Sequence, residues 1–321
     1  MRILIIGAAG KRTRTEFYIR RGFRAAGHRV FWVNDRRMRH VFGAAGPRVV
    51  RAALRCIDPE FLLLTHATGL EPATVAELCH GRRAAMWYFD MREEIPEHLV
   101  ETARAAGTLF LTNRGWIDEI RSRGVPAVHF LPQACDARIH RYMPSPAGPQ
   151  YELSFVGRAD PGSYRQRLLE ETGAQVDLHV WDKPRGFTPD AYILHPKRVF
   201  NTELARVVGA SFAVAGFGHH PSHLNVRAYA SNRVWLTLGC GGFYFGHATP
   251  GMSDVVPGGK YCEYYRSVDE LAEKIRYYKR HPKQREEIRD AGYRWVHAHH
   301  TYEKRVQNLL SMRGLATGLQ A

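Results

Sequence analysis

The chain has 321 residues, of which 45% are hydrophobic, and its formal net charge is +15. This length suggests two domains of ordinary size, and the hydrophobic content is sufficient for a proper core. No apolar run approaches the roughly 18 residues that a membrane-spanning helix needs, so no such helix is expected. The five cysteines are odd in number and form no CxxC pair, which favours reduced thiols and a cytoplasmic setting.

Positive charge is concentrated near the N-terminus. Residues 1–55 contain 14 Lys and Arg side chains against only Glu16 and Asp35, which gives this segment a net charge of +12. One explanation is an arginine-rich solvated surface. The other is an anionic partner, either a phospholipid surface, an acidic or phosphorylated acceptor, or nucleic acid. The composition leaves both explanations open.

Strand and helix patterns alternate through the first half of the chain. Residues 2–6 are all apolar apart from Arg2, as expected for a strand of a parallel sheet that is buried on both faces. A glycine-containing turn over 7–10 precedes a predicted helix over about 13–26, and a second helix is predicted near 72–79. Further strands are predicted over 30–33, 61–64, 84–89, 108–112 and 127–131. This alternation predicts right-handed βαβ units and a doubly wound sheet.

A second alternating run follows the proline-rich segment 143–149, which is the best candidate for an interdomain linker. Strands are predicted here over 151–157, 176–181, 212–215, 242–245 and 262–265. Long helices are predicted over about 268–280 and 283–298, and a shorter one over about 301–312. The second half therefore repeats the α/β pattern of the first.

The most informative segment lies in this second half. Arg233 opens a predicted helix that runs into the Gly-Cys-Gly-Gly turn at 239–242, and an apolar strand follows. Asp254 and the loop Gly258-Gly259-Lys260 come downstream. In this order, backbone N–H groups and one cation can approach a nucleotide diphosphate closely.

This ordered set resembles the nucleotide-sugar half of two-domain GT-B glycosyltransferases, in particular the group-1-like, CgeB-like branch. Other segments that carry the resemblance are 155–158 with Arg165, 269–278 and 300–305, and more weakly 111–113 and 131–136. The resemblance implies an α/β fold of two Rossmann-like, doubly wound domains that face a cleft. The acceptor-side domain would cover 1–148 and the donor-binding domain 149–300, and 301–321 would cross back onto the first domain.

The resemblance also implies a donor site. Arg158 and Arg165 stand where the family places cations for the diphosphate, and Arg233 stands at the family's arginine ahead of the glycine turn. Fixed arginines would stabilise the charge of a leaving nucleoside diphosphate without a metal. Solvated helix positions or surface salt bridges are the structural alternatives. The predicted donor-binding residues are Gly157, Arg158, Arg165, His219, Asn225, Arg233, Gly241, Gly242 and Asp254.

Two side chains that follow apolar strands in the first half are candidates for catalysis. His66 follows the strand over 61–64 and Asp90 follows the strand over 84–89, at the edge where open α/β sheets bind ligands. Either could orient or deprotonate an acceptor hydroxyl, as an inverting transferase requires. A retaining mechanism and a purely structural role remain open. The predicted acceptor-binding residues are Gly10, Lys11 and Arg14.

The sequence departs from the family at two positions where many relatives have Glu. Leu236 and Tyr261 stand there, which leaves the donor and the detailed mechanism open; Asp254 or Glu263 are candidate substitutes. A non-catalytic nucleotide-sugar or nucleic-acid binding module is therefore the alternative function. The turn over 7–10 lacks the third glycine of G-x-G-x-x-G, which argues against a nicotinamide enzyme.

A metal ion and a cofactor are not expected. The histidines His219, His220 and His223 are close in sequence, but Pro221 interrupts any helix that would align them as metal ligands. The predicted function is metal-independent transfer of a hexose-type sugar from a UDP- or GDP-sugar to an unidentified acceptor. Candidate acceptors are a small molecule, a glycan or a protein, a lipid or membrane surface, and modified nucleic acid. The expected location is cytoplasmic, with a peripheral position at a membrane as a further option.

Overall fold

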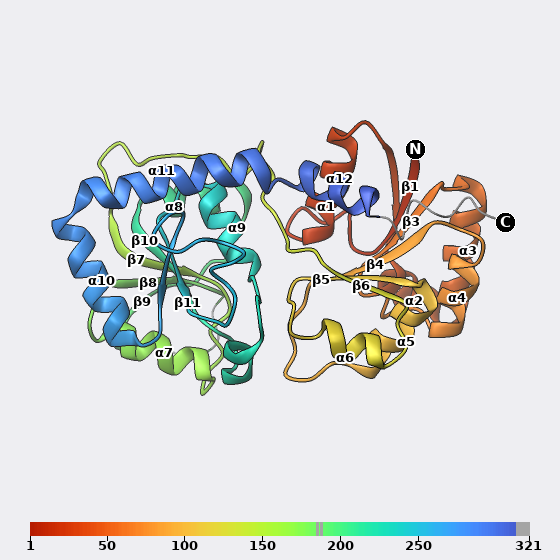
Figure 1. Ribbon diagram of the computed structural model, residues 1–321, viewed down its shortest axis with the longest axis horizontal. Helices are drawn as coiled ribbons and strands as arrows, with labels where there is room; N and C mark the ends of the chain where they lie inside the picture. Colours follow the sequence, from red (N-terminus) through yellow and green to blue (C-terminus); the bar gives the residue numbers. More distant parts are fainter. Residues whose placement is uncertain (184–185, 187–188, 313–321) are drawn as a thin grey trace. The chain divides into compact units, whose positions relative to one another are not determined.

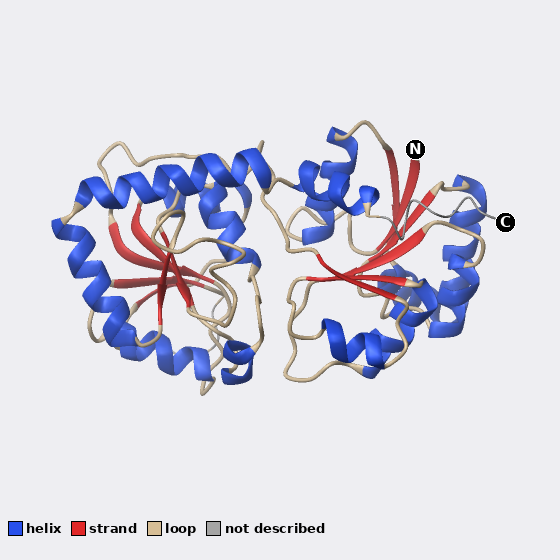
Figure 2. Ribbon diagram, in the orientation of Figure 1, coloured by secondary structure: helices blue, strands red, loops and turns tan. Residues whose placement is uncertain are grey.

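The computed structural model describes residues 1–183, 186 and 189–312. They form two compact units: the first contains Met1–Gln133 and the helix α12 (Tyr302–Ser311), and the second contains Ala134–Thr301. In the described residues, each unit has one parallel sheet of six strands with helices on both faces (Figures 1 and 2). The two doubly wound α/β domains that the sequence pattern predicts are therefore confirmed.

In the first unit the strand order is β2-β1-β3-β4-β5-β6. The strands are β1 (Arg2–Ile6), β2 (Arg29–Val33), β3 (Phe61–Leu64), β4 (Ala84–Tyr88), β5 (Thr108–Leu111) and β6 (Ala127–Phe130). The helices are α1 (Thr15–Ala25), α2 (Asp35–Phe42), η1 (Gly43–Ala45), α3 (Gly46–Ile57), α4 (Pro72–Cys79), α5 (Glu97–Ala106) and α6 (Ile117–Ser122). The chain reverses its direction of winding between β1 and β3.

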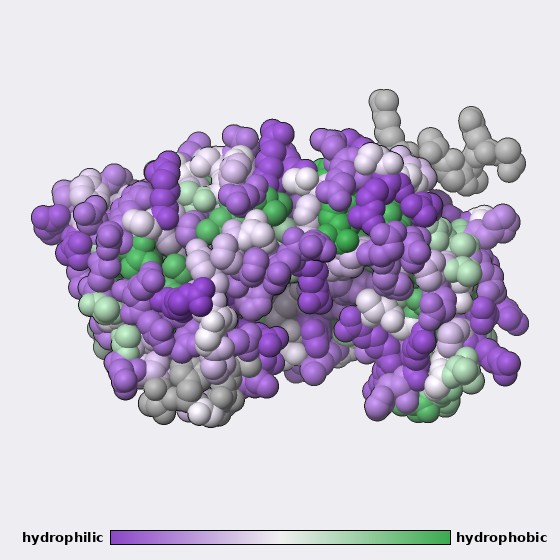
Figure 3. Space-filling model, turned by 90° about the horizontal axis from the view of Figure 1, so that it is seen from below, coloured by the Kyte–Doolittle hydropathy of each residue, from purple (hydrophilic) through white to green (hydrophobic). Residues whose placement is uncertain are grey.

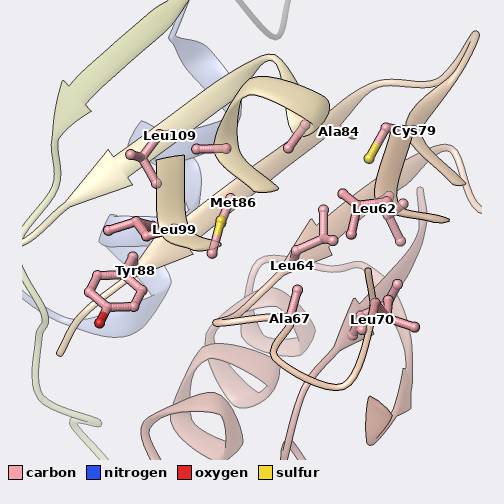
Figure 4. Packing of buried hydrophobic residues seen from close by; sticks show 14 of the residues in the cluster. Leu62, Leu64, Ala67, Leu70, Cys79, Ala84, Met86, Tyr88, Leu99 and Leu109 are labelled. Atoms are coloured by element: carbon pink, nitrogen blue, oxygen red, sulfur yellow. The ribbon is translucent and has the colours of Figure 1, made fainter. Parts of the chain in front are cut away.

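The central strands of this sheet are apolar along their whole length because helices cover both faces. On one face, Leu62 and Leu64 of β3 pack beside Met86 and Tyr88 of β4, and Leu99 of α5 covers them (Figure 4). Because all the strands of this sheet are parallel, their carboxyl ends meet along one edge of the sheet.

In the second unit the strand order is β12-β11-β10-β7-β8-β9. The strands are β7 (Tyr151–Val156), β8 (Leu178–Trp181), β9 (Ile193–His195), β10 (Ser211–Gly216), β11 (Tyr244–His247) and β12 (Glu263–Tyr265). The helices are α7 (Tyr164–Gly173), α8 (Asn201–Gly209), η2 (Pro221–Asn225), α9 (Asn232–Gly239), α10 (Val268–Arg280) and α11 (Pro282–His299). The direction of winding reverses between β7 and β10.

The proline-rich segment 143–149 belongs to the second unit. The Ser145 N–H donates to the Gly209 carbonyl at the end of α8. A Cβ at Gly209 would lie only 1.9 Å from the Met143 carbonyl oxygen, so the segment packs closely on that helix. The first unit ends at Gln133, well before the boundary expected at 148. The prolines of 143–149 mark an irregular segment within the second unit. The chain passes from the first unit to the second between Gln133 and Ala134.

The helix α12 packs on α1 in the first unit (Figure 1). The rings of Tyr18 and Tyr302 stack with their centroids 5.8 Å apart. The backbone of Tyr302 lies against Gly22, where a Cβ would be 2.6 Å from the Tyr302 carbonyl oxygen. Among the helices of the described ranges, none combines the length and hydropathy of a membrane span.

Candidate donor site and candidate catalytic pair

Two cavities open at the carboxyl edge of the second sheet, near the reversal between β7 and β10. Ligands bind at such points in open α/β sheets because the two flanking loops diverge there. The larger cavity has a volume of about 330 Å³ and the smaller one about 200 Å³. Both are lined by Ser231 and Arg233 at the N-terminus of α9. Arg233 is thus common to both cavities.

Arg233 is held by neutral groups. Its Nε donates to the Val156 carbonyl at 2.9 Å, and its guanidinium lies 4.6 Å from the centroid of the Phe155 ring. Burial lowers the pKa of Arg233. Among the described residues, no carboxylate forms an ion pair with this guanidinium.

Arg165 of α7 lies over the same Phe155 ring, 5.5 Å from its centroid, and its side chain is buried. Its Nη1 donates to the Arg158 carbonyl at 2.8 Å and its Nε to the Phe217 carbonyl at 3.2 Å. Burial, and secondarily the charge of Arg233, lower the pKa of Arg165 to about 9. It too has no ion pair within the described part of the chain. The charge of Asp160 offsets this lowering of the pKa only in part. Two desolvated cations that donate hydrogen bonds to neutral carbonyls favour a bound anion.

Gly157 makes room for this arrangement. A Cβ there would lie 2.6 Å from Arg233 Nη2 and 2.8 Å from the Phe155 ring. The neighbouring Arg158 is exposed, and its Nε lies 2.5 Å from Asp160 Oδ2. Arg158 lines the larger cavity, whereas Arg165 lines the smaller one. The structure therefore brings Gly157, Arg158, Arg165 and Arg233 together, as the sequence predicts.

The larger cavity has mainly apolar walls, among them Trp181, Val199 and Leu236. Leu236 is apolar, so this wall carries no charge at that position. Asp182 also lines the cavity; it is buried, and its carboxylate accepts a hydrogen bond from the Ala159 N–H at 3.0 Å. Sequence reasoning missed Asp182, although it follows an apolar strand in the same way as Asp90.

His219 lines the smaller cavity, and burial, followed by the charge of Arg165, lowers its pKa. Four other predicted donor residues line neither cavity. Asn225 and Asp254 are exposed and line neither cavity.

Gly241 and Gly242 lie at the opposite end of α9 from Arg233. A Cβ at Gly241 would be 2.6 Å from Tyr142, and one at Gly242 would be 2.5 Å from Val208. These glycines serve close packing of the chain on itself, and neither lines either cavity. In the described ranges, no group of three His, Cys, Asp or Glu side chains could hold a metal ion.

His66 and Asp90 meet at the carboxyl edge of the first sheet because β3 and β4 are neighbours. His66 Nδ1 lies 3.8 Å from Asp90 Oδ2, within ion-pair distance but beyond a direct hydrogen bond. The imidazole also contacts the Phe89 ring edge-on at 4.5 Å. Burial lowers the pKa of His66, and the charge of Asp90 opposes that effect. The imidazole is therefore neutral near pH 7 and able to accept a proton.

The backbone at His66 is unusual. His66 and Ala67 have φ values of 61° and 49°, in the left-handed region that non-glycine residues rarely occupy. Such strain is concentrated at functional sites, where surrounding contacts hold it in place. Gly10, Lys11 and Arg14 are exposed in the loop after β1, which is the neighbour of β3 on the same sheet edge.

A comparison with known protein families gives a match that covers most of the second unit. The model of a family described as glycosyl transferase-like matches residues 158–311. Anabaena HepE, crystallised with UDP and glucose, is similar over 97% of this chain and 99% of its own, with a TM-score of 0.68 and 14% identity. No curated protein sequence matches the chain.

Two further solved structures agree. A glycosyltransferase from Rickettsia africae is similar over 98% of each chain, with a TM-score of 0.67 and 6% identity. Sucrose-phosphate synthase from Thermosynechococcus elongatus is similar over 98% of this chain and 99% of its own, with a TM-score of 0.66 and 13% identity. The fold is therefore GT-B, as the sequence predicts.

Proposed function

We propose that the chain is a glycosyltransferase whose second unit binds a nucleoside-diphosphate sugar. The observation that carries this proposal is the pair Arg165 and Arg233, two desolvated guanidiniums on one Phe155 ring without a carboxylate partner in the described residues. A diphosphate supplies the missing negative charge. It gains charge as the sugar leaves, so fixed guanidiniums bind the transition state more strongly than the ground state.

The nucleoside belongs in the larger cavity under this proposal. Its apolar walls, with Trp181 and Leu236, suit a base and ribose, and Asp182 and Arg198 are polar groups that could fix orientation. We take UDP as the first donor nucleotide to test because HepE was crystallised with it. The two arginines supply the positive charge that a metal ion would otherwise provide, so the proposed reaction is metal-independent. A hexose is the proposed sugar because HepE was crystallised with glucose beside UDP.

His66 is the proposed base of the first unit, with Asp90 as the group that orients it. The neutral imidazole would take the proton of an acceptor hydroxyl, and Asp90 would stabilise the imidazolium that forms. Lys11 and Arg14 would contact the acceptor. The membership of the chain in the CgeB-like branch is likewise a proposal, and it rests on the motifs around Arg233.

The donor proposal is tested by calorimetric titration with UDP. Arg233→Gln should weaken UDP binding roughly 10- to 100-fold, because a hydrogen bond to a charged group is worth about 1.5–3 kcal/mol. Gly157→Ala should also weaken it by displacing Arg233 while keeping every charge. Arg276→Gln, an exposed arginine on α10, is the matched control. Equal UDP affinity in all four proteins would overturn the assignment.

The non-catalytic alternative rests on Leu236, which leaves the larger cavity without the glutamate of many relatives. The two functions differ in turnover. A transferase releases UDP from UDP-sugar when an acceptor takes the sugar, and releases it slowly when water takes the sugar instead. His66→Gln should reduce that release while UDP affinity is retained. A binding module binds UDP-sugar and releases no UDP under any of these conditions.

A further inference from the structure

The surface is mostly hydrophilic on the face shown in Figure 3, and its hydrophobic areas there are small and separate. Three of the seven exposed large hydrophobic side chains in the described residues nevertheless lie within one short segment of the first unit. They are Trp32, Val41 and Phe42, and Val41 and Phe42 are 57% and 50% exposed. The concentration of apolar side chains in this segment needs an explanation.

Val41 and Phe42 form the end of α2, and the exposed Ala44 and Ala45 of η1 follow. Phe42 lies one turn beyond Met38, which is partly buried against the core of the first unit. The apolar stripe of α2 therefore starts at the core and continues into solvent. We call residues 41–45 the hairpin tip, because α2 and α3 pack against each other on either side of it.

The hairpin is held rigidly. Asp35 at the start of α2 is buried and accepts a hydrogen bond from the Gly69 N–H at 2.7 Å, and Arg39 pairs with Glu71 at 2.7 Å. Gly46 allows α3 to begin directly against the backbone of Arg39, where a Cβ would be 2.7 Å from the Arg39 nitrogen. The tip cannot fold back to bury its apolar side chains without breaking these contacts.

The hairpin itself is rich in positive charge. Residues 36–57 contain six arginines and no acidic residue. Arg37 lies one turn before Val41 on α2, and Arg48 lies in the first turn of α3 just after the tip. Both side chains are exposed, and in the described part of the chain neither forms an ion pair. The tip thus presents exposed apolar side chains beside arginines that form no ion pair with the described residues. This combination is complementary to a surface with anionic groups on the outside and an apolar layer beneath them.

We propose that the hairpin tip docks the protein on anionic phospholipid bilayers. Val41 and Phe42 enter the boundary between headgroups and acyl chains, and Arg37 and Arg48 contact the phosphates. Each arginine near an anionic membrane surface adds to the attraction, and the attraction weakens with salt. The acidic neighbours of the hairpin, Glu71 and Glu77, are paired with Arg39 and Arg51, so Arg37 and Arg48, without an ion pair in the described residues, leave a net positive charge at the tip. That charge favours an anionic surface. The proposal is independent of the donor site in the second unit.

The test is co-sedimentation of the full chain with vesicles of phosphatidylcholine alone and of phosphatidylcholine mixed with phosphatidylglycerol. We expect binding to the anionic vesicles, little binding to the neutral ones, and a loss of affinity at high salt. The double substitution Val41→Ser and Phe42→Ser should weaken binding about tenfold or more without changing the charge. Arg37→Gln with Arg48→Gln should weaken it to a similar extent and flatten the salt dependence.

Two controls match these variants. Ile193→Ser removes a side chain of β9 in the second unit that is 51% exposed, and Arg276→Gln with Arg280→Gln removes two exposed charges from α10. Both should bind vesicles like the wild type, and every variant should keep the wild-type melting temperature and UDP affinity. The proposal is overturned if the wild type ignores anionic vesicles, if the tip variants bind unchanged, or if the controls lose as much binding. A change of oligomeric state in the serine variant with unchanged vesicle binding would also overturn it.

Discussion

At the residue scale, the behaviour of both candidate sites follows from desolvation. Arg165 and Arg233 are charged groups with neutral partners only, so burial disfavours their charged forms and an anion relieves that cost. His66 is the opposite case, because burial holds it neutral and ready to accept a proton. Under the proposed function, the same physical effect prepares one site for a diphosphate and the other for a hydroxyl proton.

The His66–Asp90 pair predicts a pH dependence. Burial lowers the pKa of His66 below its ordinary value of 6.5, and Asp90 raises it again in part. If His66 is the base, kcat/KM should fall at acid pH with a midpoint below 6.5. Asp90→Asn removes the charge that favours imidazolium, so the midpoint should move to still lower pH. The measurement is UDP release from UDP-sugar across pH 4.5–8, a range chosen to bracket ordinary histidine titration.

The exposed Asp118 of α6 provides the control, since Asp118→Asn leaves the surroundings of His66 untouched. A shift of the midpoint to higher pH in Asp90→Asn would contradict the pairing. Stability should follow the same sign. Because unfolded histidine binds a proton at higher pH than folded His66 does, the contribution of this group to stability is lost as pH falls from 6.5 through the folded pKa.

At the scale of elements, the contact between α1 and α12 depends on one missing side chain. Replacing Gly22 by Ala in a helix would normally stabilise it by about 1 kcal/mol. Here the new Cβ would lie 2.6 Å from the Tyr302 carbonyl oxygen, and overpacking typically costs about 1–3 kcal/mol. Because backbone atoms cannot rotate away, the cost outweighs the gain, and we expect Gly22→Ala to lower the free energy of unfolding by up to about 2 kcal/mol in urea titrations.

Ala25→Ser is the comparison for this prediction, since Ala25 is an exposed residue of the same helix. It should change the free energy of unfolding by less than about 0.5 kcal/mol. An increase in stability in Gly22→Ala would mean that α12 moves aside without loss, and that the close packing of α12 on α1 contributes little.

The elements also show where sequence patterns succeed. Strands such as β1, β3 and β4 were predicted within one residue because apolar runs buried on both faces contrast sharply with the loops around them. The short edge strand β9 was not predicted, because Ile193 is exposed and the strand has no buried apolar run. His66, Asp90 and Arg233 could be found because they border predicted strands or the glycine turn. Asp182 also follows a predicted strand, and the same argument that selected Asp90 could have selected it.

At the scale of the whole molecule, the two units each have their own core and sheet. UDP should therefore protect amides of the second unit selectively in hydrogen-exchange measurements on the full chain. We expect slower exchange at the N-terminus of α9 and in the loops that follow β7 and β10. Peptides covering 61–90 of the first unit should exchange at unchanged rates. Protection of 61–90 by UDP alone, with α9 unaffected, would contradict the placement of the nucleotide in the second unit.

The sequence by itself determined the α/β alternation, the positions of most strands and the residues that stand at their ends, because burial periodicity and glycine or proline signals are local properties. Only the tertiary structure decided which of those residues meet. Arg165 and Arg233 are 68 residues apart in the numbering and share the Phe155 ring because α7 and α9 flank the same strand ends. Gly241 and Gly242 belong to the same motif as Arg233 yet lie at the far end of α9. The order of the strands in the sheet decides whether such residues meet. That order depends on contacts between residues far apart in the sequence, which no local pattern encodes.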